Sequence, residues 1–135
     1  MIDTVNVWHR MIESRDIAGL DLLLADDVVF HSPVVHAPQV GKTVTKLYLT
    51  AAYSVFLNGT FRYVREVVGE HDAVLEFMVE IDGITVNGVD MLEWNRDGMI
   101  TVRTDGDLRL HAVRQPQHLQ RRIHARVPAD LVAAI

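Results

Sequence analysis

Residues 73–94 read AVLEFMVEI-DG-ITVNGVDMLEW, and this stretch decides the fold. Apolar side chains recur at every second position on both sides of Asp82-Gly83, which is the pattern of two half-buried strands. An Asp-Gly pair between two alternating runs is among the strongest local signals for a two-residue hairpin, because both turn residues must adopt a positive φ. We therefore predict strands over 73–81 and 84–94, joined by a tight turn.

The turn also predicts which side chains share a face of the hairpin. If Ile81 lies opposite Ile84, the rest of the register follows, since successive side chains of a strand point to opposite faces. One face is then apolar and comprises Leu75, Phe77, Val79, Ile81, Ile84, Val86, Gly88, Asp90 and Leu92. The other face comprises Glu76, Met78, Glu80, Thr85, Asn87, Met91 and Glu93. Asp90 is thus a carboxylate on the apolar face, opposite Leu75.

A carboxylate in this position has two explanations. Burial disfavours the charged form of a carboxyl group and raises its pKa, which suits a general base or a protonated hydrogen-bond donor. Alternatively, Asp90 bonds to a buried backbone group, a tyrosine or an arginine, and only holds the sheet together. Arg65, on a preceding strand over 60–68, is one candidate partner.

The chain before residue 60 has helical periodicity. Asp3 or Thr4 begins a first helix, and Asp16 begins a second, short one. A third helix is predicted over 43–57, ended by Asn58-Gly59. The apolar positions of the three helices are, in order, Val5, Trp8, Met11 and Ile12; Ile17, Leu20, Leu23 and Leu24; and Val44, Leu47, Tyr48, Ala51, Ala52, Val55 and Phe56.

Two further segments complete the expected order of elements. Val28 to His31 is a β-rich run stopped by Ser32-Pro33, and 33–41 is predicted to be a loop because it holds two prolines and a glycine. Asp97-Gly98 predicts a turn into a strand that begins near Met99. Helices come first and a meandering antiparallel sheet follows, so the predicted class is α+β.

Composition narrows the function. The chain has 135 residues, no cysteine and a formal net charge of −5. Lack of cysteine excludes disulfides and thiolate metal sites and fits a reducing compartment, so we expect a cytoplasmic protein. The negative charge argues against nucleic acid as a partner. Met1 to Thr4 has no basic run followed by an apolar one, and no window has the ~20 apolar residues of a membrane span, so neither a signal peptide nor membrane attachment is expected.

The order of motifs resembles SnoaL-like domains of the nuclear transport factor 2-like superfamily. The resemblance rests on residues 8–17, on Leu23-Leu24-Ala25-Asp26-Asp27-Val28-Val29-Phe30, on 86–91 and on Asp97-Gly98-Met99-Ile100. It implies a cone-shaped fold in which a curved antiparallel sheet wraps the N-terminal helices around a small-molecule pocket. It also implies a homodimer that pairs through the sheet. Such domains include ketosteroid isomerases, polyketide cyclases, limonene epoxide hydrolases and dehydratases, so the fold names no reaction.

The known catalytic residues of these relatives do not carry over. Ser32 stands where ketosteroid isomerases have an aspartate base, and Trp8 lies near the place of their oxyanion tyrosine. Phe77 and Val79 stand where epoxide hydrolases need an arginine and an aspartate. Asp90, His31 and Tyr63 remain as catalytic candidates. The expected ligand pocket consists of Trp8, Phe30, Ser32, His36, Tyr48, Phe56, Phe77, Val79 and Val86.

Two functions follow from these residues. The first is binding of a small hydrophobic molecule, with proton-transfer chemistry such as isomerisation, cyclisation or dehydration. Asp90 would then be the base or acid, and a Tyr or His would stabilise the oxyanion. The alternative is a non-catalytic ligand-binding or dimerisation module in which Asp90 is structural. His31 and His36 flank a proline without an evident third ligand, so no metal site and no cofactor are expected.

The last quarter of the sequence departs from this pattern. Residues 1–101 match a SnoaL-like core, whereas 102–135 hold 6 of the 13 Lys and Arg but only 3 of the 18 Asp and Glu. We interpret 102–135 as an atypical last strand and tail of the same domain. Its Arg-, Gln- and His-rich composition suggests either a reading frame shifted relative to relatives or a genuine basic tail that docks on an acidic surface. Sequencing the gene and finding close homologues with the same tail would exclude the shifted frame.

Overall fold

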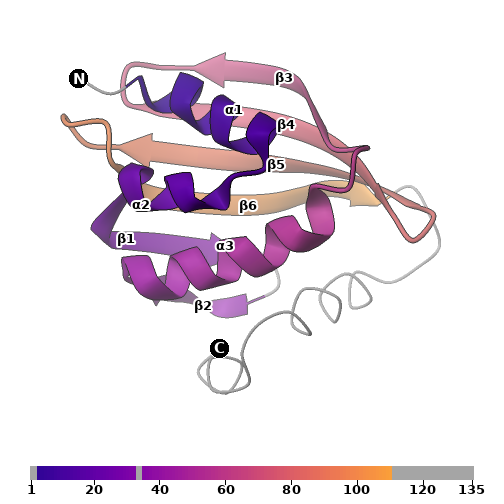
Figure 1. Ribbon diagram of the computed structural model, residues 1–135, viewed down its shortest axis with the longest axis horizontal. Helices are drawn as coiled ribbons and strands as arrows, with labels where there is room; N and C mark the ends of the chain where they lie inside the picture. Colours follow the sequence, from indigo (N-terminus) through magenta and orange to yellow (C-terminus); the bar gives the residue numbers. More distant parts are fainter. Residues whose placement is uncertain (1–2, 33–34, 111–135) are drawn as a thin grey trace.

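The computed structural model of this chain describes the backbone of residues 3–32 and 35–110, and the side chains of 3–31 and 40–103. Both hypotheses for the C-terminal tail concern residues that lie mostly outside these ranges. Within them, three α-helices lie on one face of a six-stranded sheet (Figure 1). The predicted α+β class, with N-terminal helices packed on a curved sheet, is confirmed.

The first helix, α1 (Thr4–Ser14), forms as the sequence predicts. The side chain of Asp3 accepts a hydrogen bond from the backbone N–H of Asn6 and so caps the helix. The buried positions are Thr4 and the four predicted apolar residues, Val5, Trp8, Met11 and Ile12. The Thr4 hydroxyl donates to the carbonyl of Gly98 at 2.7 Å, which ties the start of α1 to the turn between the last two strands.

The second predicted helix is shorter and divided. Asp16 caps a 3-10 turn, η1 (Ile17–Gly19), which continues into α2 (Leu20–Leu23). Leu24 is buried but belongs to strand β1 (Leu24–Ser32), not to the helix. The strand therefore begins four residues before the β-rich run that the sequence shows. Leu24 fits the apolar pattern of both elements, because its side chain would point into the same core from either one.

The sheet contains β1 and five further strands: β2 (Val35–Val40), β3 (Arg62–Val68), β4 (Asp72–Ile81), β5 (Ile84–Trp94) and β6 (Ile100–Leu110). Their order is β2-β1-β6-β5-β4-β3. The strands β3 to β6 form the predicted antiparallel meander. By contrast, β1 pairs with β6 in parallel, so the sheet is mixed. The long connection from β1 through α3 to the meander permits this parallel pairing.

The prediction of a loop over 33–41 is wrong for 35–40, which form β2. This strand pairs antiparallel with β1 and lies at the edge of the sheet. Proline removes a donor from the strand ladder and is therefore confined mainly to edge strands, where one side has no neighbour. Pro38 lies in such a strand. Counting prolines therefore led to the wrong prediction of a loop where the edge strand β2 forms.

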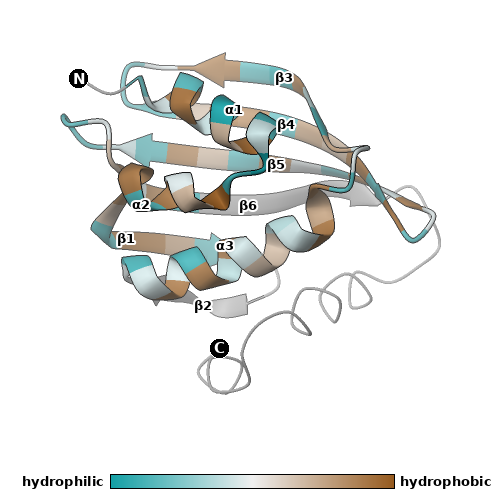
Figure 2. Cartoon of the chain, in the orientation of Figure 1, coloured by the Kyte–Doolittle hydropathy of each residue, from teal (hydrophilic) through white to brown (hydrophobic). Residues whose placement is uncertain are grey.

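The hairpin that decided the fold is confirmed in its register. Ile81 lies opposite Ile84, and the pairing runs without a shift to Asp72 opposite Glu93. Asp82 and Gly83 have φ values of 53° and 79°, as a two-residue turn of this hand requires. The predicted apolar face is buried along both strands, and Figure 2 shows hydrophobic and hydrophilic residues alternating along them.

The third helix, α3 (Lys42–Phe56), is rotated slightly from the predicted orientation. Leu47 is exposed, whereas Thr45, Leu49 and Tyr53 are buried together with most of the predicted face. Because Thr45 is polar, a pattern based only on apolar residues did not identify the buried face of α3 correctly. The helix lies over β1 and β2 (Figure 1) and brings its two buried tyrosines into the core. Among the described residues, no helix is long and apolar enough to cross a membrane.

Candidate functional site

Asp90 lies at the centre of a buried polar network. It is 2% exposed, on the helix-covered face of β5. Its Oδ1 accepts a hydrogen bond from Nη2 of Arg103 on β6 at 2.9 Å, and its Oδ2 accepts one from the hydroxyl of Tyr63 on β3 at 2.7 Å. Each carboxylate oxygen therefore has a strong donor. This arrangement matches the structural explanation of a carboxylate on an apolar face.

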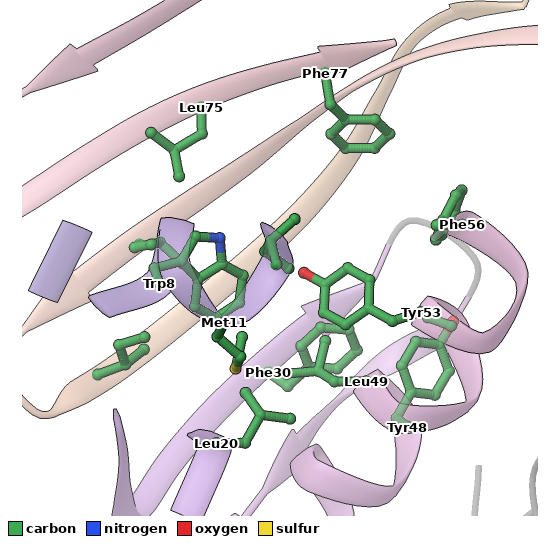
Figure 3. Packing of buried hydrophobic residues seen from close by; sticks show 14 of the residues in the cluster. Trp8, Met11, Leu20, Phe30, Tyr48, Leu49, Tyr53, Phe56, Leu75 and Phe77 are labelled. Carbon is green, nitrogen blue, oxygen red and sulfur yellow. The ribbon is translucent and has the colours of Figure 1, made fainter. Parts of the chain in front are cut away.

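Arg103 is held by aromatic rings as well as by this ion pair. It is fully buried, and its guanidinium carbon lies 5.0 Å from the ring centroid of Trp8 and 5.7 Å from those of Phe30 and Tyr53. Nη2 also donates to the Tyr53 hydroxyl. Figure 3 shows Trp8 and Tyr53 directed toward one another from α1 and α3. Cation–π attraction and the Asp90 charge together offset the cost of burying the guanidinium.

Tyr63 closes the network on the side of β3. Its hydroxyl accepts a hydrogen bond from Nε1 of Trp8 at 2.8 Å and donates to Asp90. Burial raises the pKa of Tyr63 well above its ordinary value, and the negative charge of Asp90 raises it further. The phenol therefore remains a neutral hydrogen-bond donor over the whole physiological pH range.

The structure brings only part of the predicted site together. Asp90, Tyr63, Trp8 and Phe30 meet in or beside this network. His31 does not join them, because it is exposed and follows the inward-facing Phe30, so it points to the opposite face of β1. The side chains of Ser32 and His36 lie outside the described residues.

The remaining predicted pocket residues lie within a closely packed core. Tyr48, Phe56, Phe77, Val79 and Val86 are all buried in the hydrophobic cluster between helices and sheet, in part visible in Figure 3. Packing is close at Gly88, where an added Cβ would lie 2.4 Å from Cζ of Phe77. The ring of Phe77 therefore occupies the space that a side chain at position 88 would need.

Open volume lies instead in a groove between α1 and β3. It measures about 750 Å³ and is bordered by Tyr63, the outermost member of the Asp90 network. Its other lining residues are Asn6, His9, Ile12, Glu13, Arg15, Leu57, Gly59, Phe61, Arg62, Val64, Arg65 and Glu66. In this groove Nε2 of His9 lies 2.6 Å from Oε2 of Glu66. The groove is thus a mixed surface of aromatic, aliphatic and charged groups.

Sequence reasoning missed Arg103, His9 and Glu66. The predicted partner of Asp90, Arg65, instead bonds to Glu76 at 3.1 Å. Strict alternation from the buried Ile100 would put Arg103 on the other face, but the pairing of β5 with β6 shifts by one residue between Glu93 and Trp94. A bulge of this kind reverses the faces that follow it. His9 and Glu66 gave no signal, because they are far apart in the sequence.

The described residues contain no group of three or more histidine and acidic side chains that could hold a metal ion. Two groups of polar side chains converge at or beside the groove, the Asp90 network and the His9–Glu66 pair. The first is closed by its own contacts and the second is accessible from the groove.

Comparison with known proteins identifies the family. Residues 5–103 match the model of the SnoaL-like domain. A steroid delta-isomerase from Pseudomonas aeruginosa is 30% identical, with a TM-score of 0.82 over 96% of this chain and 92% of that one. An uncharacterised protein with a cystatin-like fold from Silicibacter pomeroyi DSS-3 is 25% identical, with a TM-score of 0.82 over 99% of this chain and 92% of that one.

A more distant structure shows how widely the fold is shared. An NTF-2 like protein of unknown function from Burkholderia xenovorans LB400 is 13% identical, with a TM-score of 0.65 over 88% of this chain and 89% of that one. At this identity the likeness concerns the fold alone. No protein with a curated description matches the chain. The family match over most of the described core shows that this chain belongs to the SnoaL-like domain family, with a nuclear transport factor 2-like fold.

Proposed function

We propose that this chain binds a small, mostly apolar carbonyl compound in the groove between α1 and β3 and catalyses a proton transfer on it. Isomerisation, cyclisation and dehydration all begin with such a step. The observation that carries the proposal is the groove itself, an open volume of about 750 Å³ with aromatic and ionisable side chains on its walls. Concave sites of this size with a few converging polar groups are the usual places for small ligands.

The walls of the groove suit a flat ligand. Tyr63 makes edge-on ring contacts with Phe61 and His9, at centroid distances of 5.1 and 5.2 Å. Phe61 in turn stacks on the buried Phe77 at 5.1 Å, which fixes this aromatic wall to the core. Ile12 and Leu57 add aliphatic surface. A ring system can lie on these groups while a polar atom reaches the charged residues.

The carbonyl class is suggested by a relative. The Pseudomonas aeruginosa protein that is 30% identical is a steroid delta-isomerase, and isomerisation of that kind moves a proton within an apolar ring compound. A cationic residue near the carbonyl would favour the negative oxygen that forms when the proton leaves. Arg15 and Arg62 both line the groove. The chain thus has the types of residue that the reaction needs at one surface.

A non-catalytic binding module is the second candidate, and one observation favours it. Both carboxylate oxygens of Asp90 are engaged by Arg103 and Tyr63. Asp90, the base expected from the sequence, is therefore occupied with structural bonds. A module that only binds its ligand would need nothing more from this network than rigidity.

One probe distinguishes these two functions. 2-Tetralone is a flat, apolar ketone whose protons next to the carbonyl exchange with D2O when the ketone enolises. We expect the protein to shift the amide resonances of α1 and β3 when 2-tetralone is added and to accelerate its deuterium exchange, followed by proton NMR. Binding without acceleration would establish the binding module. If the protein neither binds 2-tetralone nor accelerates its deuterium exchange, the proposed function is refuted.

We also propose that two copies of the chain pair through the outer face of the sheet. Val67, Val74 and Met91 lie in one row across β3, β4 and β5 on that face and are 66%, 41% and 40% exposed. We expect Val74→Lys to convert a dimer into a monomer in light scattering coupled to gel filtration. Leu22→Lys, at an exposed leucine on α2, is the matched control and should leave the dimer intact. A wild-type protein that is monomeric at high concentration would contradict the pairing.

A further inference from the structure

We infer that His9 and Glu66 are the proton-transferring pair of this chain, with His9 as the base and Glu66 as the residue that positions it. The inference rests on the proposed function and names the residues that perform it. The two side chains come from different elements, α1 and β3, and meet in the wall of the groove. Neither residue stands out in the sequence, since 57 positions separate them.

The geometry of the pair is that of an oriented imidazole. Nε2 of His9 lies 2.6 Å from Oε2 of Glu66, a distance typical of a strong, charge-assisted hydrogen bond. A carboxylate in this position holds the proton on Nε2 and leaves Nδ1 as the proton acceptor. It also stabilises the imidazolium that forms when Nδ1 takes up a proton. The Tyr63 ring, edge-on at 84° to the imidazole, limits how far the ring can turn.

Exposure separates this pair from the Asp90 network. The side chains of His9 and Glu66 are 25% and 45% exposed, so a ligand in the groove can reach them. Asp90 and Arg103 are 3% and 1% exposed and hold each other. A general base must lie within hydrogen-bond reach of the proton that it removes, directly or through one water molecule. Among the described residues of this core, the His9–Glu66 pair meets that condition on the groove and Asp90 does not.

Proton transfer to His9 breaks one bond of the ligand and forms one bond of the imidazole. The bond between hydrogen and the carbon next to the carbonyl breaks, and a new N–H bond forms at Nδ1 of His9. The electron pair of the broken C–H bond forms a carbon–carbon double bond, and the π pair of the carbonyl group moves to its oxygen, which gives an enolate. The proton then returns from the imidazolium to the same carbon or to another carbon of the conjugated system. The protein is regenerated, and no oxidant, reductant or further reactant is consumed.

Charged neighbours complete the electrostatics of the groove. Arg15 ends α1 in the left-handed conformation, with φ of 59°, and its Nη2 would lie 3.7 Å from a Cβ added at Gly59. Arg62 also borders the groove and donates to the carbonyl of Thr60 at 3.2 Å, but its pairing with Met78 directs its side chain to the outer face of the sheet. Glu13 is the second carboxylate of the groove. Arg15 is therefore the guanidinium group on the helix side of the groove, and its positive charge would favour the negative enolate oxygen.

The chain contains a matched control for this pair. His71 and Glu70 lie beside one another between β3 and β4, at 3.8 Å, and both are exposed outside the groove. They offer the same two residue types without an aromatic wall and without an enclosed volume. Variants of this second pair therefore measure any effect of losing a surface histidine or glutamate as such.

The test measures deuterium exchange of 2-tetralone with wild type, His9→Gln, Glu66→Gln, His71→Gln and Glu70→Gln. We expect His9→Gln to lower the protein-catalysed rate about a hundredfold, the usual range for loss of a general base. Glu66→Gln should lower kcat about tenfold and leave KM unchanged, because it misorients the base without touching the ligand. Both controls should match the wild type. Circular dichroism checks that each variant is folded.

The outcomes separate the inference from the proposed function. Acceleration by the wild type that survives in both His9→Gln and Glu66→Gln would overturn the inference and leave the proposed function standing. A rise in KM with unchanged kcat in His9→Gln would also overturn it, because the histidine would then only bind. A wild-type protein that neither binds 2-tetralone nor accelerates its exchange would overturn both.

Discussion

Glu66 and Asp90 occupy the same row of the sheet and behave very differently. Both lie opposite Leu75, Glu66 from β3 and Asp90 from β5, so all three side chains point to the helix-covered face. Each carboxylate bonds to a basic side chain, His9 in one case and Arg103 in the other. Yet Glu66 is half exposed, and Asp90 is almost completely buried.

The difference comes from position in the sheet. β3 is an edge strand, and the groove between it and α1 is open, so water and ligands reach Glu66 beside the helix. β5 lies between β4 and β6, and the aromatic core covers Asp90 completely. A carboxylate therefore stabilises the interior at position 90 and is available for chemistry at position 66. Tyr63 borders both environments, with its hydroxyl on Asp90 and its ring against His9.

The largest expected effect contrasts the two carboxylates directly. Asp90→Ala leaves the charge of Arg103 buried without its acidic partner, and removing one member of a buried ion pair costs about 3 to 5 kcal/mol. Glu66→Ala should change the free energy of unfolding by less than about 0.5 kcal/mol, since exposed pairs contribute little. Urea denaturation of both variants checks the comparison. Equal losses would show that the two environments do not differ energetically.

A second change tests how tightly the interior around Asp90 is packed. Gly88→Ala places a methyl group 2.4 Å from the Phe77 ring, and overpacking of this kind costs about 1 to 3 kcal/mol. Thermal unfolding measures the loss. The double variant with Phe77→Leu should recover part of it, because the smaller side chain vacates the site. If the stability losses of the two single variants simply add in the double variant, the Phe77 ring does not obstruct position 88.

The third prediction concerns Tyr63, which links the two environments. Tyr63→Phe removes a donor to Asp90 and should cost about 1 kcal/mol at pH 7. The folded-state pKa of Tyr63 is raised above its unfolded value of about 10. The unfolded chain therefore loses this proton first, and the stability that Tyr63 contributes falls as pH rises above about 10.

Denaturation curves between pH 7 and pH 11 measure this dependence. The stability difference between wild type and Tyr63→Phe should be constant up to about pH 10 and should then shrink. Subtracting the free energy of unfolding of Tyr63→Phe from that of the wild type cancels the effect of the other tyrosines and of the lysines, because these groups titrate in both proteins. A difference that stays constant to pH 11 would place the Tyr63 hydroxyl in a solvated environment and would remove it from the closed network.

The hairpin over 72–93 was predictable because its signals are local. Alternation over nine or more residues and an Asp-Gly turn specify strands, register and the buried face together, and the register holds over the whole hairpin. The cap of α1 and its apolar stripe were equally local. By contrast, β2 was missed because an edge strand tolerates the proline that usually marks a loop.

The candidate site was predictable only in part. Asp90 stood out because a carboxylate interrupted an apolar face. Its partner Arg103 did not, because the shift in register between β5 and β6 reversed the face on which position 103 lies. His9 looked like any polar residue on the outer side of a helix. Whether it meets a glutamate depends on how α1 lies across β3, which no local pattern encodes.

By itself, the sequence determined most of the elements, the hairpin register and the presence of one carboxylate on the inner face of the sheet. These features depend on interactions between residues that are close in the chain. Only the tertiary structure decided which basic group reaches each carboxylate, that Asp90 is closed and that Glu66 lies on an open groove. These properties depend on strand order and helix placement, because burial is a property of what surrounds a side chain in space.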